Sequence, residues 1–296
     1  METVGVVGLG LMGSGFAANL LSRGHGVLVY NRTESKAEAL SSRGAAFRRA
    51  PADLAREADV VLTSLTDGKA VEEVAFGPGG FVKAMRRGAL WLDASTIDPR
   101  TSVRHAQQAK EFGVERLDTP VVGGPAAASQ GKVVLLVGGD EGVYRKRTRL
   151  LDELGQKVVY LGPDGSGHKM KLAVNLYLGL TAMSFSEAVV LAQKMGFRAS
   201  DFVNAFNSTA HRNPFSETKG PKIAAGDYTP TFTLDNMLKD LRLAGDEAKA
   251  RGTTLPLFAK GLEFASAAAA REGSRDYSAL AKELQRLNDT AQEERD

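Results

Sequence analysis

The sequence has 296 residues, enough to bury a sizeable core and to divide into two domains. It is 43% hydrophobic and 25% charged with a formal net charge of +3, and its basic residues are interspersed with acidic ones, so we expect no nucleic-acid partner. It contains no cysteine, which excludes disulfides, thiolate nucleophiles and cysteine-ligated metal sites.

The first strand is expected to begin by Thr3, which leaves no room for a targeting peptide before it. Further along, Thr181, Ser184, Ser186 and Glu187 interrupt the longest apolar stretch, so that it falls short of the roughly 18 residues that span a bilayer. We therefore expect a cytoplasmic protein with no membrane partner.

From Thr3 to about Gly162, apolar runs typical of strands alternate with helical patterns. This alternation predicts an α/β fold with a parallel, doubly wound sheet. The predicted strands are residues 4–7, 27–30, 60–65, 90–95, 114–122, 133–137 and 157–161. The predicted helices between them are residues 14–21, 35–42, 71–76, 100–111 and 144–154.

A glycine-rich turn follows the first predicted strand, with the sequence Gly8-Leu9-Gly10-Leu11-Met12-Gly13. A strand, a tight glycine turn and a helix N-terminus together present backbone N–H groups and the positive end of a helix dipole to a pyrophosphate. The second predicted strand follows at the expected spacing. The sequence therefore predicts a Rossmann-like domain whose dinucleotide phosphates bind at these six residues.

The second predicted strand ends in Asn31-Arg32-Thr33, where an NAD-binding domain would carry an acidic residue for the ribose hydroxyls. Arg32 can stack on adenine or pair with a 2′-phosphate, and Asn31 and Thr33 can donate hydrogen bonds to its oxygens. We expect NADP as the cofactor, with NADPH preferred over NADH. The alternative is that Arg32 is an ordinary solvated arginine.

After Gly165 the strand pattern gives way to helical periodicity, which predicts an NADP-binding domain over residues 1–162 and an all-helical substrate and dimerisation domain over residues 163–296. A long helix over residues 168–195, ended by Gly196, is apolar or small on nearly every face. It must be buried in the helical domain or against another subunit. We expect a homodimer or homotetramer.

Lys171 and Asn175 lie four residues apart near the start of this helix and therefore share a face, with His168 nearby. A partly desolvated lysine can donate a proton near neutral pH. On the spacing alone, an ordinary helix lysine is the better interpretation of Lys171, and His168 is a second candidate acid. The remaining histidines have no ligand-like spacing, so no metal site is predicted.

Five motifs occur in order along the chain: the glycine turn, Asp93-Ala94-Ser95-Thr96, Pro120-Val121-Val122-Gly123-Gly124, Gly165-Ser166-Gly167 with Lys171 and Asn175, and Lys239-Asp240-Leu241. With these five motifs in this order, the chain resembles the β-hydroxyacid dehydrogenase family, which includes 3-hydroxyisobutyrate dehydrogenase and the glyoxylate/succinic semialdehyde reductases. The resemblance implies an oxidoreductase that transfers a hydride between a nicotinamide and a small anionic 3-hydroxy acid or the corresponding aldehyde acid.

The resemblance also implies roles for individual residues. Lys171 would be the catalytic acid and base. Substrate binding would involve Ser95, Thr96, Val122, Gly123, Gly124 and Asn175. Further cofactor contacts would come from Leu65, Thr66, Thr96 and Lys239, and Lys239 falls off the core stripe of its predicted helix.

Val122 departs from the family pattern, which usually has serine there. A valine side chain cannot make the hydrogen bond of a hydroxyl, so the substrate stays open among 3-hydroxyisobutyrate, succinic semialdehyde and glyoxylate types. Two alternatives also stay open: an imine reductase on the same scaffold, which Lys171 disfavours, and a non-catalytic NADP-binding module.

Overall fold

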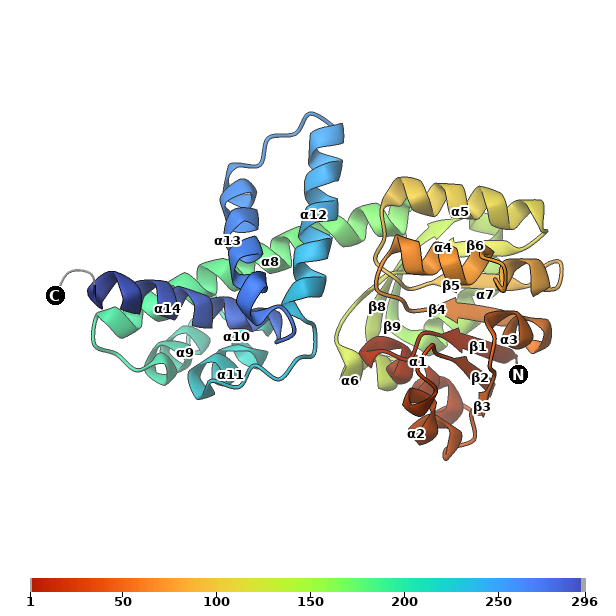
Figure 1. Cartoon of the computed structure of the whole chain (residues 1–296), viewed down its shortest axis with the longest axis horizontal. Coiled ribbons are helices and arrows are strands. Elements are labelled where there is room, and N and C mark those ends of the chain that lie inside the picture. The colour runs from red at the N-terminus through yellow and green to blue at the C-terminus, as the bar shows by residue number, and fades with distance from the viewer. Residues whose placement is uncertain (1, 294–296) are drawn as a thin grey trace. The chain divides into compact units, whose positions relative to one another are not determined.

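The computed structural model describes residues 2–293 of the chain (Figure 1). The chain divides into two compact units, Met1–Lys171 and Leu172–Asp296, which are called the N-terminal unit and the helical unit. The N-terminal unit carries the sheet, and the helical unit is described separately below.

The N-terminal unit contains a nine-stranded sheet in the order β3-β2-β1-β4-β5-β6-β8-β7, with β9 paired to β8. Its first six strands are parallel in the order 3-2-1-4-5-6, which is that of a Rossmann sheet. The strands are β1 (Thr3–Val7), β2 (Gly26–Tyr30), β3 (Ala46–Phe47), β4 (Val60–Thr63), β5 (Leu90–Asp93), β6 (Glu115–Asp118), β7 (Val121–Val122), β8 (Val133–Gly139) and β9 (Gly155–Tyr160).

Helices cover both faces of this sheet, as the doubly wound pattern predicts. Alternate strand residues enter two separate cores: Leu90 and Leu92 of β5 belong to one cluster, and Trp91 belongs to the other. The helices are α1 (Leu11–Ser22), α2 (Glu38–Ser41), α3 (Pro51–Glu57), α4 (Gly68–Phe76), α5 (Pro99–Glu111), α6 (Pro125–Ser129) and α7 (Glu141–Leu154). Short 3₁₀ turns precede α2 and β5.

The prediction of one parallel strand over residues 114–122 is wrong. The parallel pairing of β5 with β6 ends at Asp93 and Asp118, and β7 pairs antiparallel with β8. Pro120, which lies between β6 and β7, has no N–H to continue the ladder. Because β8 is also antiparallel to β6, the sheet is mixed at this edge rather than parallel throughout.

The helical unit contains no strand among its described residues, as predicted; its nearest approach to one is a bridge between Thr233 and Asp276. Met183, Phe185 and Val189 of the long helix α8 pack into its core cluster. The helices are α8 (Ser166–Lys194), which begins in the N-terminal unit, α9 (Ala199–Asn207), α10 (Pro214–Thr218), α11 (Gly220–Ala225), α12 (Leu234–Ala250), α13 (Pro256–Glu272) and α14 (Leu280–Glu293), with a 3₁₀ turn before α14.

Helix α8 is, by length and hydropathy, able to cross a membrane, which the expectation of too short an apolar stretch did not anticipate. Of its most apolar 18-residue window, 44% is buried inside the protein. Phe185 and Val189 on the buried side belong to the core, while Tyr177 and Leu191 are 69% and 60% exposed. The buried side of α8 is therefore that of a core helix.

Candidate active site

Three loops meet where the parallel strands β1, β4 and β5 end. The register aligns Val7 of β1 with Thr63 of β4, and Thr63 with Asp93 of β5, so the chain leaves all three strands at one edge. This edge contains the point where the strand order reverses, between β1 and β4, where ligands bind in such sheets. The structure thus brings together the glycine turn and the loops that carry Leu65, Thr66, Ser95 and Thr96.

The glycine turn has the geometry that a dinucleotide requires. Gly8 has a φ of +96°, and a Cβ atom at Gly13 would lie 1.9 Å from the carbonyl oxygen of Gly8. Only glycine therefore allows α1 to start so close to β1. Gly10 caps α1 without a side-chain hydrogen bond, the first turn contains no acidic residue, and a Cβ atom at Gly10 would meet open space. The N-terminus of α1 fits a pyrophosphate.

The three residues after β2 that were expected to bind a 2′-phosphate have different surroundings. Oδ1 of Asn31 accepts a hydrogen bond from the backbone N–H of Leu9 at 3.0 Å, and its Nδ2 donates to the carbonyl oxygen of Thr33 at 2.9 Å. Asn31 therefore braces the glycine turn. Arg32 and Thr33 are exposed next to it.

Ser95 links the loops that follow β4 and β5. It is 2% exposed, and its Oγ accepts a hydrogen bond from the backbone N–H of Leu65 at 3.0 Å. The side chain expected to bind substrate is thus used inside the protein, to hold one loop against the other. Thr96, the next residue, is half-buried.

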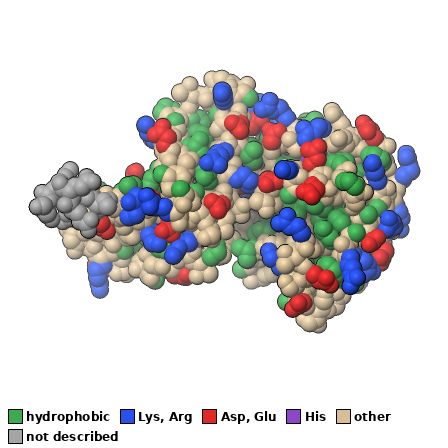
Figure 2. Space-filling view, in the orientation of Figure 1, with side chains coloured by type: hydrophobic (Ala, Val, Ile, Leu, Met, Phe, Trp, Pro, Cys, Tyr) green, Lys and Arg blue, Asp and Glu red, His purple; other side chains and the backbone are tan. Residues whose placement is uncertain are grey.

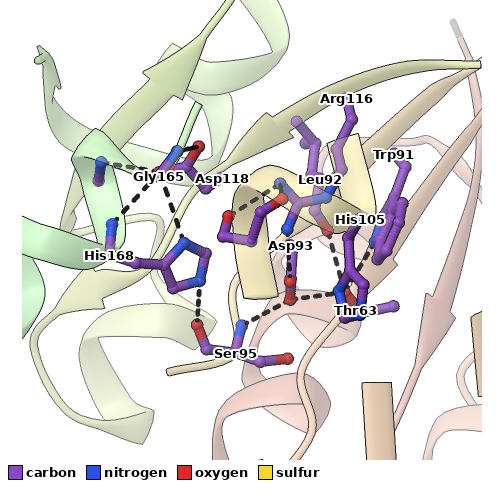
Figure 3. A network of polar contacts seen from close by, with 12 residues as sticks. Thr63, Trp91, Leu92, Asp93, Ser95, His105, Arg116, Asp118, Gly165 and His168 are labelled. Atoms are coloured by element: carbon purple, nitrogen blue, oxygen red, sulfur yellow. Dashed lines mark hydrogen bonds and ion pairs between the residues drawn. The ribbon is translucent and has the colours of Figure 1, made fainter. Parts of the chain in front are cut away.

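A buried ion pair between Asp93 and Arg116 lies next to these loops, and Figure 3 shows it near Ser95. Asp93, at the end of β5, accepts hydrogen bonds from Thr63 at 2.9 Å, from the backbone N–H of Ser95 at 3.1 Å and from Arg116 at 2.8 Å. The Arg116 guanidinium lies 4.6 Å from the ring centre of Trp91. Asp93 stands in one of the five motifs but was given no role, and Arg116 was not singled out, because the sequence does not show that these two charges are buried together.

The start of α8 carries the two candidate acids. Lys171 is half-buried. His168, one turn earlier, is fully buried, and its Nε2 lies 3.0 Å from the carbonyl oxygen of Ser95. A carbonyl oxygen only accepts, so Nε2 donates this bond. His168 is therefore committed to an internal contact, which leaves Lys171 as the better candidate acid.

The helical unit carries Asn175 and Lys239, joined by a residue that was not singled out for a role. Nδ2 of Asn175, which is 1% exposed, donates to Oδ2 of Asp240 at 2.5 Å, and Nζ of Lys239 lies 2.6 Å from Oδ1 of Asp240. Oδ1 of Asn175 has no hydrogen-bond partner among the described residues. A signal for Asp240 exists in the sequence, because this charged residue falls on the buried stripe of α12 beside Leu241.

The turn expected to grip the substrate follows β7. Val122 is half-buried and pairs with Val134 of β8, Gly123 has a φ of +136°, and Gly124 is the N-cap of α6. Gly123 and Gly124 are exposed. Helix α6 packs on α1, so this turn and the glycine turn are attached to the same pair of helices.

A Rossmann sheet with a glycine turn at the start of α1, followed by a helical unit, defines a protein that binds a dinucleotide. Two family models match the chain. Residues 3–162 match the NAD binding domain of 6-phosphogluconate dehydrogenase, and residues 165–284 match the model described as NAD-binding of NADP-dependent 3-hydroxyisobutyrate dehydrogenase. The chain belongs to the β-hydroxyacid dehydrogenase family.

Two relatives and one solved structure match this chain over 89% or more of their own length. Glyoxylate/succinic semialdehyde reductase 1 of Arabidopsis thaliana is 34% identical, over 94% of this chain and 96% of that protein. A probable mitochondrial 3-hydroxyisobutyrate dehydrogenase of Dictyostelium discoideum is also 34% identical, over 94% and 89%. The structure of Mycobacterium tuberculosis 3-hydroxyisobutyrate dehydrogenase with L-serine superposes with a TM-score of 0.85 at 30% identity, over 96% and 99%. These matches place the chain among the oxidoreductases of this family.

Proposed function

We propose that the protein transfers a hydride between NADP(H) and a small 3-hydroxy acid or its aldehyde acid, with Lys171 as the general acid and base. This proposal rests on the surroundings of Lys171 at the start of α8. There Lys171 is half-buried, His168 is committed to Ser95, and Asn175 follows Lys171 by four residues on the same helix face. The relatives named above act on hydroxy acids or semialdehydes, as their names state.

In the direction of reduction, a reduced nicotinamide cofactor held at the glycine turn would supply the hydride for the carbonyl carbon. Nζ of Lys171 donates a proton to the carbonyl oxygen as negative charge develops there. In the opposite direction, the neutral amine of Lys171 accepts the proton of the alcohol. Asn175 is held by Asp240 through its amide nitrogen, and its Oδ1, which has no hydrogen-bond partner among the described residues, would accept a hydrogen bond from a hydroxyl of the substrate.

The preference for NADP rests on the end of β2. Arg32 is exposed at this position, no acidic residue ends the strand to repel a 2′-phosphate, and the neighbouring Asn31 is engaged in bracing Leu9. The helical unit adds Lys239, a cation that we include among the residues that bind the anionic cofactor.

The choice of substrate depends on the turn at Val122. Its apolar side chain offers no hydrogen bond, so the carboxylate would be held by the backbone N–H groups of Gly123 and Gly124. Backbone donors suit any small carboxylate. Glyoxylate, succinic semialdehyde and methylmalonate semialdehyde are therefore the first compounds to test.

Association with a second copy is part of the proposal, because Tyr177 and Leu191 leave apolar surface exposed on α8. We include neither a membrane nor a nucleic acid among the partners. The buried side of α8 belongs to a protein core, and Figure 2 shows basic and acidic side chains interspersed over the visible face. A cytoplasmic location completes the proposal.

The test is NADPH oxidation with a panel of small aldehyde acids and cyclic imines, using wild type, Lys171→Ala and Lys169→Ala. Lys169 is an exposed lysine on the same helix and serves as the matched control. We expect turnover of an aldehyde acid that falls about 10²- to 10⁴-fold in Lys171→Ala, the usual contribution of a general acid, and is retained in Lys169→Ala. Reduction of imines alone would contradict the proposed substrate, and full activity of Lys171→Ala would exclude it as the acid.

A further inference from the structure

The beginning of α8 is built around the carboxylate of Asp118, the last residue of β6. Oδ1 of Asp118 accepts a hydrogen bond from the backbone N–H of Gly165 at 3.0 Å. Its Oδ2 accepts from the N–H groups of Gly167 at 2.7 Å and His168 at 3.2 Å. The side chain of Asp118 is fully buried. A strand from the middle of the N-terminal unit thus holds the first turn of the helix that carries Lys171.

Two glycines make this approach possible. A Cβ atom at Gly138 would lie 2.5 Å from Oδ2 of Asp118, and one at Gly167 would lie 2.7 Å from the same oxygen and 2.3 Å from the carbonyl oxygen of Leu136. Any side chain at Gly167 would push α8 away from the carboxylate. The motif Gly165-Ser166-Gly167 therefore has a physical reason in this chain, which is to let the helix start against Asp118.

The carboxylate is charged at every physiological pH. Burial works to raise the pKa of Asp118, but the hydrogen bond and charge of His168 and the charge of Arg116 outweigh it and lower the pKa to about 2. A negative charge at the N-terminus of a long helix interacts favourably with the helix dipole. Asp118 thus adds an electrostatic contribution to its three hydrogen bonds.

His168 extends the connection to the loops of the candidate active site, as Figure 3 shows. Its Nδ1 lies 3.5 Å from Oδ2 of Asp118, and its Nε2 donates to the carbonyl oxygen of Ser95. Ser95 in turn accepts the N–H of Leu65. A continuous series of contacts runs from the first turn of α8 to the loops after β4 and β5, all of it inside the N-terminal unit.

We propose that Asp118 and His168 are positioning residues. They fix the position and orientation of the helical turn that carries Lys171, relative to the loops that carry Leu65 and Ser95. The inference rests on the proposed function, because it assigns Lys171 the proton transfer. A misplacement of about 1 Å between reacting groups can cost on the order of 10²-fold in rate. Neither side chain needs to touch the substrate to have this effect.

The experiment compares Asp118→Asn, His168→Phe and His168→Gln with wild type in the full chain. Asparagine keeps the shape of Asp118 but loses its charge and presents an N–H₂ group to backbone donors. Phenylalanine fills the site of His168 without a donor for Ser95, whereas glutamine can still donate. Asp140→Asn is the matched control, because Asp140 caps α7 through the N–H of Val143, in a helix with no proposed site residue.

Active sites are counted by NADPH binding, and kcat is expressed per bound NADPH. We expect kcat to fall 10- to 100-fold in Asp118→Asn and His168→Phe, with NADPH Kd and substrate KM within about threefold of wild type. The primary isotope effect with 4-deuterated NADPH should rise, because hydride transfer becomes slow. His168→Gln should lie closer to wild type, and Asp140→Asn should match it.

A purely structural cap would lower the melting temperature and the number of binding sites but leave kcat per site and the isotope effect unchanged, and that result would overturn the inference. If Asp118→Asn does not fold, the two His168 variants decide the question. Hydrogen exchange at residues 165–171 gives a readout without turnover, and unchanged exchange in Asp118→Asn and His168→Phe would also overturn it. Faster exchange in a protein whose wild type reduces no aldehyde acid would instead contradict the proposed function.

Discussion

Individual charged residues have roles here that depend on what surrounds them. Asp93, Asp118 and Asp240 are all buried, and each holds a residue that the sequence pointed to: Ser95, His168 and Asn175. The glycine turn could be singled out from the sequence because it is a local pattern with a known chemistry, whereas Lys171 was given its role only through the resemblance to the family. The contacts of the three aspartates could not be predicted, because their partners lie far away along the chain and burial is a tertiary property. Asp93 and Asp240 stand in two of the five motifs, but the motifs do not show what these carboxylates hold.

Arg32 tests the cofactor preference. Arg32→Ala should weaken NADPH binding about 10- to 100-fold, as expected for the loss of a charge-assisted contact, and NADH binding less than threefold. Fluorescence titration of both cofactors measures this directly. Arg149→Ala, at a 91% exposed side chain on α7, is the control. Equal losses for the two cofactors would remove Arg32 from phosphate recognition.

Asp240 tests the orientation of Asn175. In Asp240→Asn the Asn175 amide loses a charged acceptor, and the ion pair with Lys239 disappears. We expect kcat/KM to fall about tenfold or more, in line with the roughly 1.5–3 kcal/mol of a hydrogen bond to a charged group. Asp246→Asn, at an exposed position of the same helix, should keep wild-type kinetics. Steady-state kinetics with wild-type values for Asp240→Asn would show that Asn175 does not depend on this carboxylate.

At the scale of elements, periodicity predicted those strands that lie in the middle of the parallel sheet. Residues 4–7, 27–30, 60–65 and 90–95 all contain observed strands, because strands buried on both faces are continuous apolar runs. Elements that depend on neighbours were missed: β3 has two residues, α6 has five, and the division of residues 114–122 depends on pairing with β8. Neither their length nor their partner is visible in a single sequence.

The packing of α6 on α1 provides a prediction at this scale. A Cβ atom at Gly15 would lie 3.0 Å from Cβ of Ala128 and 3.0 Å from the carbonyl oxygen of Pro125. Gly15→Ala should therefore displace α6 with the attached Gly123-Gly124 turn, at a cost of about 1–3 kcal/mol from overpacking, partly offset by alanine's higher helix propensity. Substrate KM should rise severalfold.

The control is Gly68→Ala, because a Cβ atom at Gly68 would make only ordinary contacts of 3.5 Å or more. Urea unfolding and steady-state kinetics measure the two effects separately. If Gly15→Ala is as stable as Gly68→Ala and leaves KM unchanged, then the contact between α1 and α6 accommodates an added methyl group. The Gly123-Gly124 turn would then not depend on this contact.

For the whole molecule, two units of different composition share one chain. The predicted cofactor residues up to Thr96 and Lys171 lie in the N-terminal unit, whereas Asn175 and Lys239 lie in the helical unit. The order of strands and helices was enough to predict both classes of fold. The buried polar groups that stabilise the N-terminal unit were not predictable, because Trp91, Arg116 and His105 come together only across β5, β6 and α5.

His105 makes the stability of the protein depend on pH. It is fully buried on α5, 5.9 Å from Trp91 and 5.3 Å from Phe76 between ring centres. Burial, and next the charge of Arg116, lower the pKa of His105 from 6.5 to about 4. The folded state therefore keeps His105 neutral while the unfolded state takes up a proton below pH 6.5. Its contribution to stability is complete above pH 6.5 and is lost as the pH falls towards 4.

His105→Phe, which keeps an aromatic ring between Trp91 and Phe76, should remove this dependence. One proton corresponds to a slope of at most about 1.4 kcal/mol per pH unit in the free energy of unfolding. Urea unfolding at pH 7, 5.5 and 4.5 should give a steeper loss for wild type than for His105→Phe. His211→Phe, at an exposed histidine, is the control and should follow wild type. A buried neutral imidazole takes up its proton only when the fold opens, and this uptake makes the free energy of unfolding depend on pH. Equal slopes for wild type and His105→Phe would therefore mean that the acid sensitivity in this range arises from other groups.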